Sequence, residues 1–156
     1  MFSKLFGKKP AHSESKKFFP ENRLEALLMQ AANDPGVRPE FYKELLAADL
    51  FVLIVPGDRP HGRYVAQEGD TLSIKGINVE GRKLIPIFTS ERRLREYIEA
   101  QDNLAQLNGR VLLSMIAAQN DGAVLNPASS FGKEFTQQEA ASLIDGSIFQ
   151  AKQQVL

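Results

Sequence analysis

The stretch LFVLIV, Leu50 to Val55, decides the fold class of this chain. It is a continuous apolar run of strand length, rich in β-branched residues, and such a run is typical of a strand buried on both faces. Two stretches with a helical spacing of apolar residues precede it, at 22–33 and from Pro39 onward. A buried strand that follows helical segments indicates an α/β domain.

Further strands are predicted downstream of a loop rich in proline and glycine, 56–62. They are the runs RYVAQ, TLSIKG and RKLIPIF, followed by a helix over 108–118 and a short strand over 123–125. Pro86 lies inside RKLIPIF and cannot donate a ladder hydrogen bond, so we expect a bulge or a locally unpaired edge there. The alternation predicts an α/β (α+β) fold, with one mixed sheet of about four to five strands and helices packed on it.

Capping residues mark the expected helix boundaries. Asn22 and Ser90 each precede a run with helical spacing and can accept a hydrogen bond from a free amide of the first turn. Thr136 and Glu139 have the spacing of a capping box, and Gly146 follows that helix as its terminator.

The bulk composition limits the classes of function. The chain has 156 residues, of which 43% are hydrophobic and 24% charged, and this suits one globular domain without covalent cross-links. Cysteine is absent, so disulfides, thiolate nucleophiles and cysteine-ligated zinc are excluded. The 19 basic and 19 acidic residues balance, which argues against a general binder of polyanions.

Residues 1–17 differ in charge from the rest of the chain. They carry a net charge of +4, whereas residues 18–156 carry a net charge of −4. We therefore divide the chain into a basic, disordered leader, 1–17, and one domain, 18–156. Two roles for the leader stay open: a solubilising tail, or a weak anchor on anionic lipid through Phe2, Leu5 and Phe6. No apolar run reaches the ~18 residues of a membrane span, so we expect a cytoplasmic protein, located at the inner membrane surface if the leader anchors it.

The stretch VLNPASSFGKEFTQQE, 124–139, raises the question of a phosphate-binding loop. A Walker-type loop needs Gly-x-x-x-x-Gly-Lys followed by Ser or Thr. Counting back five residues from Gly132 gives Pro127, which lacks an amide hydrogen, and Lys133 is followed by Glu134, which repels an anion. We interpret the stretch instead as a strand, an Asn-Pro turn and a loop that lead into a helix.

Catalytic and metal-binding patterns are missing from the sequence. There is no Gly-x-Ser-x-Gly nucleophile motif and no His-Glu-x-x-His metal motif. Of the two histidines, His12 lies in the leader and His61 lies beside Arg59 in the 56–62 loop. This loop holds the best acid–base cluster of the chain, with a solvated loop as the alternative interpretation. We expect no cofactor and no metal.

Nucleic-acid binding is not expected either. Arg92, Arg93 and Arg95 could form a basic face on one helix, but three glutamates alternate with them. This pattern is typical of an exposed helix with many ion pairs.

Four blocks then occur in one order along the chain. They are FFPENRLEALL at 18–28, RPEFYKELLAADLFVLI at 38–54, LIPIFTSERRLREYI at 84–98 and VLNPASSFGKEFTQQE at 124–139. Together they resemble the N-terminal domain of the SseB family, named for enhanced serine sensitivity, over about residues 18–145. The resemblance implies a bacterial protein without an established catalytic activity. Larger members of the family have a further C-terminal domain, whose function is not transferred to this chain.

The resemblance also implies candidate site residues. Among the matching motif positions, Asn126, Lys133 and Glu134 are harder to explain by folding alone than the capping and core positions. Two roles stay open for them: hydrogen bonding within a turn, or a polar rim on a recognition surface. Together with Arg59 and His61 on another loop, they form the expected partner-binding set.

The expected function is that of a non-enzymatic interaction module that binds a protein partner through its loop surface. The partner could be a secretion component, a regulator, or a toxin that a small immunity protein neutralises. The alternative is a small-molecule-binding protein or an enzyme centred on the loop that contains His61.

Overall fold

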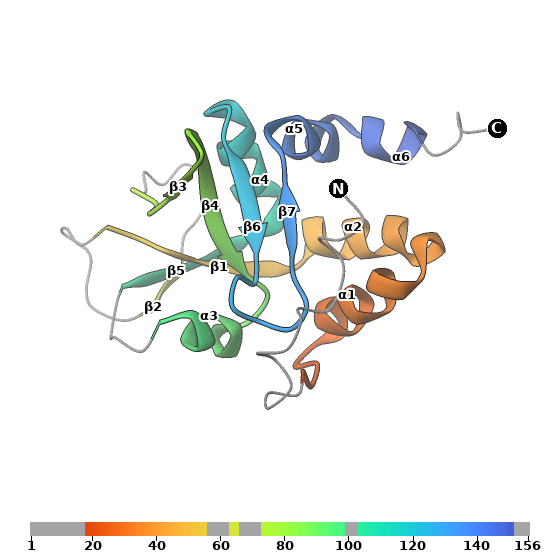
Figure 1. The fold of residues 1–156 in the computed structure, drawn as a ribbon, viewed down its shortest axis with the longest axis horizontal. Coiled ribbons are helices and arrows are strands. Elements are labelled where there is room, and N and C mark those ends of the chain that lie inside the picture. Colours follow the sequence, from red (N-terminus) through yellow and green to blue (C-terminus); the bar gives the residue numbers. More distant parts are fainter. Residues whose placement is uncertain (1–17, 56–62, 66–72, 99–102, 152–156) are drawn as a thin grey trace.

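A computed structural model of the chain describes residues 18–55, 63–65, 73–98 and 103–151 (Figure 1). Its elements, in chain order, are α1 (Arg23–Asn33), the short 3₁₀ helix η3 (Pro35–Val37), α2 (Arg38–Ala47), β1 (Asp49–Leu53), β2 (Arg63–Val65), β3 (Ile77–Val79), β4 (Arg82–Phe88), α3 (Glu91–Tyr97), β5 (Leu104–Asn108), α4 (Gly109–Ala118), β6 (Gly122–Leu125), β7 (Lys133–Phe135), α5 (Gln137–Asp145) and α6 (Ser147–Ala151).

The strands form one mixed sheet in the order β2-β5-β1-β4-β6-β7, and β3 pairs with β4 beyond this path. The central strand β1 is antiparallel to both of its neighbours, β4 and β5. The pairs β2–β5 and β4–β6 are parallel. The predicted α/β class with a mixed sheet is confirmed, and the sheet is larger than the four to five strands expected.

Two hydrophobic cores lie on opposite faces of this sheet. The larger core lies between the sheet and helices α1, α2, α4 and α5 (Figure 1). Leu50 and Val52 of β1 and the following Ile54 face it, whereas Phe51 and Leu53 face the smaller core beneath α3. The run LFVLIV is therefore buried on both faces, as its composition predicts.

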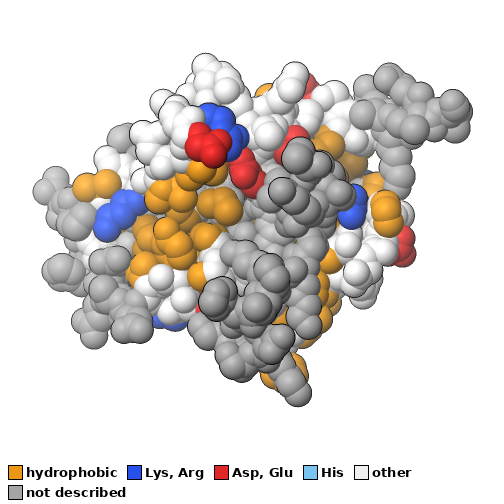
Figure 2. Space-filling view, in the orientation of Figure 1, with side chains coloured by type: hydrophobic (Ala, Val, Ile, Leu, Met, Phe, Trp, Pro, Cys, Tyr) orange, Lys and Arg blue, Asp and Glu red, His pale blue; other side chains and the backbone are white. Residues whose placement is uncertain are grey.

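Of the two faces of the sheet, the one that α3 packs on is covered less completely. Figure 2 shows hydrophobic side chains gathering over β3 and β4, below a group of acidic and basic side chains. Ile77 of β3 is 36% exposed there, and it pairs across the hairpin with Leu84 of β4.

The predicted caps are confirmed. The side chain of Asn22 accepts a hydrogen bond from the amide of Glu25 in α1. The side chain of Ser90 accepts one from the amide of Arg93 in α3. Thr136 and Glu139 form a reciprocal capping box at the start of α5. That helix ends at Gly146, whose φ of 86° lies in the left-handed region that glycine adopts without strain.

Pro86 occupies the position in β4 that the sequence predicts. On the same edge of β4, residues 82–84 pair with β3 and residues 87–88 pair with β1. Pro86 lies between these two pairings, where no antiparallel partner requires an amide donor. The expectation of a locally unpaired edge is confirmed.

The observed strands differ from the predicted ones in three places. The strand predicted over TLSIKG, 71–76, lies instead at Ile77–Val79, and in the described part of that run only Ile74 forms a bridge, to Ile54. The strands β5 and β7 were not predicted. Strand β5 is defined by a partner distant in sequence, since it aligns with β1 along its whole length, whereas β7 pairs with β6, the strand just before it.

Helix α4 packs closely against α2. A Cβ atom at Gly109 would lie 1.9 Å from the carbonyl oxygen of Leu45, and the Gly109 amide donates to the carbonyl of Ala48 at 2.8 Å. Only glycine permits this approach. Among the described residues, no helix combines the length and apolar character needed to cross a membrane.

Candidate functional site

The largest group of buried polar side chains joins three parts of the chain that are distant in sequence. Glu25 on α1 is 0% exposed and Arg93 on α3 is 1% exposed. The Nη2 and Nε atoms of Arg93 donate to Oε1 of Glu25 at 3.0 and 3.2 Å. With Thr89 and Asn126 these two residues form what we call the Glu25–Arg93 network.

Both oxygens of the Glu25 carboxylate are fully engaged. Oε1 also accepts the backbone amide of Glu21 at 2.9 Å, and Oε2 accepts the hydroxyl of Thr89 at 2.5 Å. A buried carboxylate needs such partners because desolvation penalises its charged form. With both oxygens bonded and its surface inaccessible, Glu25 ties α1 to α3 and to the end of β4.

All three nitrogens of the Arg93 guanidinium also donate hydrogen bonds. Its Nη1 donates to Glu96 at 2.8 Å and its Nη2 donates to the backbone carbonyl of Phe19. Its Cζ lies 3.8 Å from the centre of the Phe18 ring, which adds a cation–π contact. Arg93 therefore fixes the segment that leads into α1 onto helix α3.

Asn126 completes the network from the loop after β6. Its Nδ2 donates to the hydroxyl of Thr89 at 2.9 Å, and its Oδ1 accepts the amide of Thr89 at 3.0 Å. Asn126 is 0% exposed, with a φ of 50° that asparagine tolerates better than most residues. Of the two roles left open for Asn126, the structure shows hydrogen bonding within the fold and not an exposed rim, because its side-chain amide pairs with Thr89 at the end of β4.

A surface segment is held rigid by this buried network. Phe19 is 59% exposed, although its carbonyl is bound by Arg93 and the neighbouring Phe18 is buried edge-on against Phe131, with ring centres 5.2 Å apart. Glu21 forms an ion pair with Arg92 at 3.0 Å beside it. We call the exposed group Phe19, Glu21 and Arg92 the Phe19 rim.

Lys133 lies in a second buried polar cluster, beneath α5. It is 2% exposed, and its Nζ donates to Oε2 of Glu139 and to the carbonyl of Glu134, both at 3.1 Å. Burial lowers the pKa of Lys133 to about 8, although Glu139 opposes this shift. Burial, with Glu139 nearby, raises the pKa of Tyr42 well above its ordinary value. Of the two roles left open for Lys133, the structure shows hydrogen bonding within the fold and not an exposed rim, since β7 turns this side chain towards the larger core.

The other expected site residues are not brought together. Glu134 is partly exposed on the opposite face of β7, where it accepts from Arg82 at 2.9 Å. Arg59 and His61 lie outside the described residues. Within the described ranges, no group of three or more histidine, aspartate or glutamate side chains is arranged to hold a metal ion.

Arg93, which is central to the network, was interpreted from sequence as part of an exposed, ion-paired helix face. The helical spacing contains a signal for its burial. Arg93 lies four residues before Tyr97, which packs against the smaller core beside Leu94. Sequence reasoning missed this pattern: an arginine on the inner face of a short helix, which needs a buried glutamate as its partner.

Comparisons with known proteins agree with the resemblance of the four sequence blocks. The family model of the SseB protein N-terminal domain matches residues 24–142. Protein SseB of Escherichia coli (strain K12) and Protein SseB of Shigella flexneri are each 31% identical to this chain over 124 residues, which is 80% of this chain and 46% of the relative. The chain thus spans about half the length of these curated relatives. No solved structure matches it.

Proposed function

The chain belongs to the family of SseB protein N-terminal domains, and from this membership we propose that it is a non-enzymatic bacterial interaction module that binds another protein through the Phe19 rim. One observation carries the proposal. A buried guanidinium, that of Arg93, holds the backbone carbonyl of Phe19, a residue that is itself 59% exposed.

Rigid exposed aromatic residues favour protein binding for two reasons. Aromatic side chains are enriched in interfaces and supply much of the apolar area that a complex buries. A backbone fixed before binding loses less conformational entropy when the complex forms. Phe19 meets both conditions, and the ion pair between Glu21 and Arg92 beside it supplies a charged border.

The chemistry of the rim indicates the kind of partner surface that would fit it. An apolar hollow would take the ring of Phe19, and its edge would carry one acidic and one basic group opposite Arg92 and Glu21. A secretion component, a regulator or a toxin neutralised by this protein as an immunity protein could each carry such a surface. We propose that the encounter takes place in the cytoplasm.

The proposed lack of catalysis is supported by the state of the polar groups. The carboxylate of Glu25 and the guanidinium of Arg93 are buried and occupied by protein partners. Asn126 contributes to the proposed function indirectly, because it holds the loop that packs beside the rim. Contacts of Glu134, Arg59 and His61 with a partner stay predictions.

A capture experiment with a matched control tests the proposal. The immobilised protein and its Phe19→Ser and Val55→Ser variants are incubated with lysate of the native host, and the bound proteins are identified. Val55 is the matched control because it is a hydrophobic residue that is 46% exposed and lies two residues after β1. Circular dichroism and urea unfolding check that both variants fold.

We expect at least one host protein to bind the wild type and the Val55→Ser variant and to be lost with Phe19→Ser. An unchanged set of bound proteins with Phe19→Ser would contradict binding through the rim. A wild type that captures no more than bare matrix would contradict the interaction module itself.

A further inference from the structure

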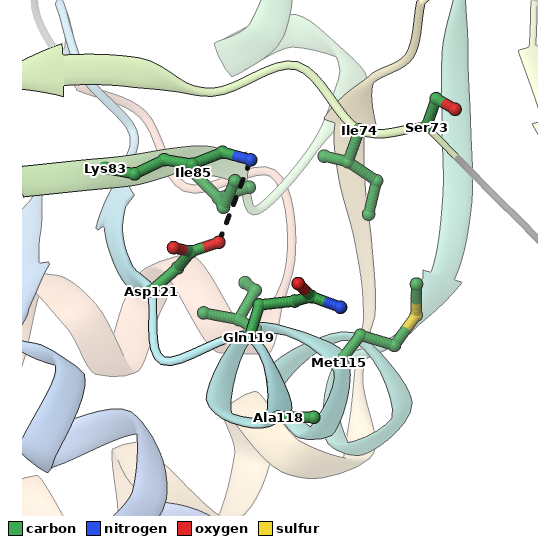
Figure 3. Close-up of a pocket in the computed structure, with 9 residues that line it drawn as sticks. Ser73, Ile74, Lys83, Ile85, Met115, Ala118, Gln119 and Asp121 are labelled. Atoms are coloured by element: carbon green, nitrogen blue, oxygen red, sulfur yellow. Dashed lines mark ion pairs between the residues drawn. The ribbon is translucent and has the colours of Figure 1, made fainter.

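A cavity of about 520 Å³ lies at the end of the larger core, away from the Phe19 rim. Its volume falls within the ~300–1,000 Å³ typical of small-molecule sites. The apolar part of its lining comes from the segment before β3, from β4 and from α4: Ile74, Ile85, Met115, Ile116 and Ala118. The polar part comes from Ser73, Lys83, Gln119 and Asp121, which Figure 3 shows around the same space.

The cavity lies where helix α4 ends and the chain turns towards β6. Helix α4 ends at Ala118, and the amide of Gln119 closes its last turn. Asn120 then adopts a φ of 58°, and the amide of Asp121 turns back to the carbonyl of Ile116 at 3.1 Å. This sharp turn places Gln119 and Asp121 at the edge of the cavity, opposite Lys83 and Ile85 of β4.

The rim of the cavity carries one positive and one negative side chain. Lys83 on β4 points towards Asp121, with Nζ and Oδ2 3.9 Å apart (Figure 3). A close charge-assisted hydrogen bond would measure about 2.7–2.9 Å. Lys83 and Asp121 are thus near enough to act on one ligand, and their contact is loose enough for each to take a closer partner.

Gly76 packs against the Lys83 side chain and leaves it the space to extend over the cavity. A Cβ atom at Gly76 would lie 2.8 Å from Cε of Lys83 and 3.1 Å from Cδ1 of Ile85. Glycine at this position leaves room for the lysine stem to lie over the cavity. The side chain of Asp121 is 14% exposed, so its charge acts in a partly desolvated setting, where electrostatic interactions are stronger than in water.

We propose that this cavity binds a small zwitterion with an apolar tail, the chemical class of the apolar α-amino acids. The ligand carboxylate lies beside Lys83, its ammonium lies beside Asp121, and its tail fills the apolar space lined by Ile74, Ile85 and Met115. A simple carboxylate would place its charge next to Asp121, and a simple amine would place its charge next to Lys83. Only a ligand with both groups keeps every charge next to its opposite.

This site is separate from the protein-binding surface proposed above, and it does not require His61. Its test uses the full chain, labelled with nitrogen-15, and three probes of the same tail: L-leucine, 4-methylpentanoate and 3-methylbutan-1-amine. Affinities are measured by titrations that follow the amide chemical shifts of the segments around the cavity, residues 73–76, 83–85 and 115–121.

We expect L-leucine to bind at least about tenfold more tightly than either half-ligand, because each half-ligand leaves one like-charge contact. Asp121→Asn should lower the affinity for L-leucine and raise that for 4-methylpentanoate. Lys83→Met should also lower the affinity for L-leucine but raise that for the amine. This opposite change in preference separates a ligand contact from a general loss of structure.

Two further variants complete the test. Ala118→Phe fills the cavity from an exposed position of α4 and should abolish the titration. Lys43→Met removes an exposed charge on α2 and should bind L-leucine as the wild type does. The proposal is overturned if L-leucine shifts no amide of these segments at its solubility limit. It is equally overturned if the three probes bind alike and the rim variants leave their order unchanged.

Discussion

Replacing Arg93 with alanine should destabilise the domain far more than replacing Arg95 on the same helix. The substitution leaves the carboxylate of Glu25 at 0% exposure without its cation, and it removes the donor for the carbonyl of Phe19. Removal of one partner from a buried ion pair costs about 3–5 kcal/mol. Since the total stability of a domain is about 5–15 kcal/mol, this single change should remove a large part of it.

Arg95 provides the matched control. It pairs with Glu91 at 2.8 Å, but the two side chains are 43% and 38% exposed. Such a surface pair contributes about 0–1 kcal/mol. Urea and thermal unfolding followed by far-ultraviolet circular dichroism suit this chain, which contains no tryptophan. At about 2–4 °C per kcal/mol for a domain of this size, Arg93→Ala should lower the Tm by roughly 6–20 °C.

A double variant separates an unpaired charge from lost packing. Replacing Glu25 and Arg93 together with methionine removes both buried charges and keeps much of the apolar volume. The double variant should therefore be more stable than the sum of the two single changes predicts. If Arg93→Ala unfolds with the same midpoint as Arg95→Ala, the role given to the network would be wrong.

Four further outcomes are expected. Thr136→Ala should lower the free energy of unfolding by about 1 kcal/mol because it removes the cap of α5; thermal unfolding measures this, and no change would contradict it. Burial lowers the pKa of Lys133 to about 8, so above that pH the unfolded chain holds a proton that the folded chain has released. The free energy of unfolding should therefore rise with pH from about 8 towards the ordinary lysine pKa, and urea unfolding of Lys133→Met should lack this rise; a rise that persists in the variant would assign it to another group. Gly109→Ala should cost about 3 kcal/mol or more, because its Cβ would overlap the carbonyl oxygen of Leu45, and a urea midpoint near that of the wild type would disprove the overlap. If the leader is an anchor, deletion of residues 1–17 should move the protein from the membrane to the soluble fraction of a lysate, whereas unchanged fractionation would leave the solubilising tail as its role.

Local patterns predicted the parts of the fold that local interactions determine. The run Leu50 to Val55 indicated its strand because apolar composition and length are sufficient for a strand covered on both faces. Asn22 and Thr136 indicated helix starts because a cap bonds amides only two or three residues away. Pro86 predicted a locally unpaired edge in its strand because proline has no backbone amide hydrogen to donate.

Features that depend on distant partners were missed. Strand β5 has the sequence LAQLN, which favours a helix as readily as a strand, and its five-residue pairing with β1 decides the outcome. Arg93 was assigned to the surface because the glutamates near it in sequence offered partners, while Glu25 lies 68 positions away. The burial of Asn126 was missed for the same reason, because its partner Thr89 lies 37 positions away.

The Glu25–Arg93 network also affects the order in which the chain can fold during synthesis. Glu25 meets Thr89 and Arg93 across 64 and 68 positions, and Thr89 meets Asn126 across another 37. Ribosomes deliver the N-terminal part first, so α1 leaves the exit tunnel long before its cationic partner has been made. Contacts of such large separation slow folding, because a long loop must close before they form. The nascent N-terminal third therefore stays open to chaperones and proteases until translation has passed the loop at Asn126.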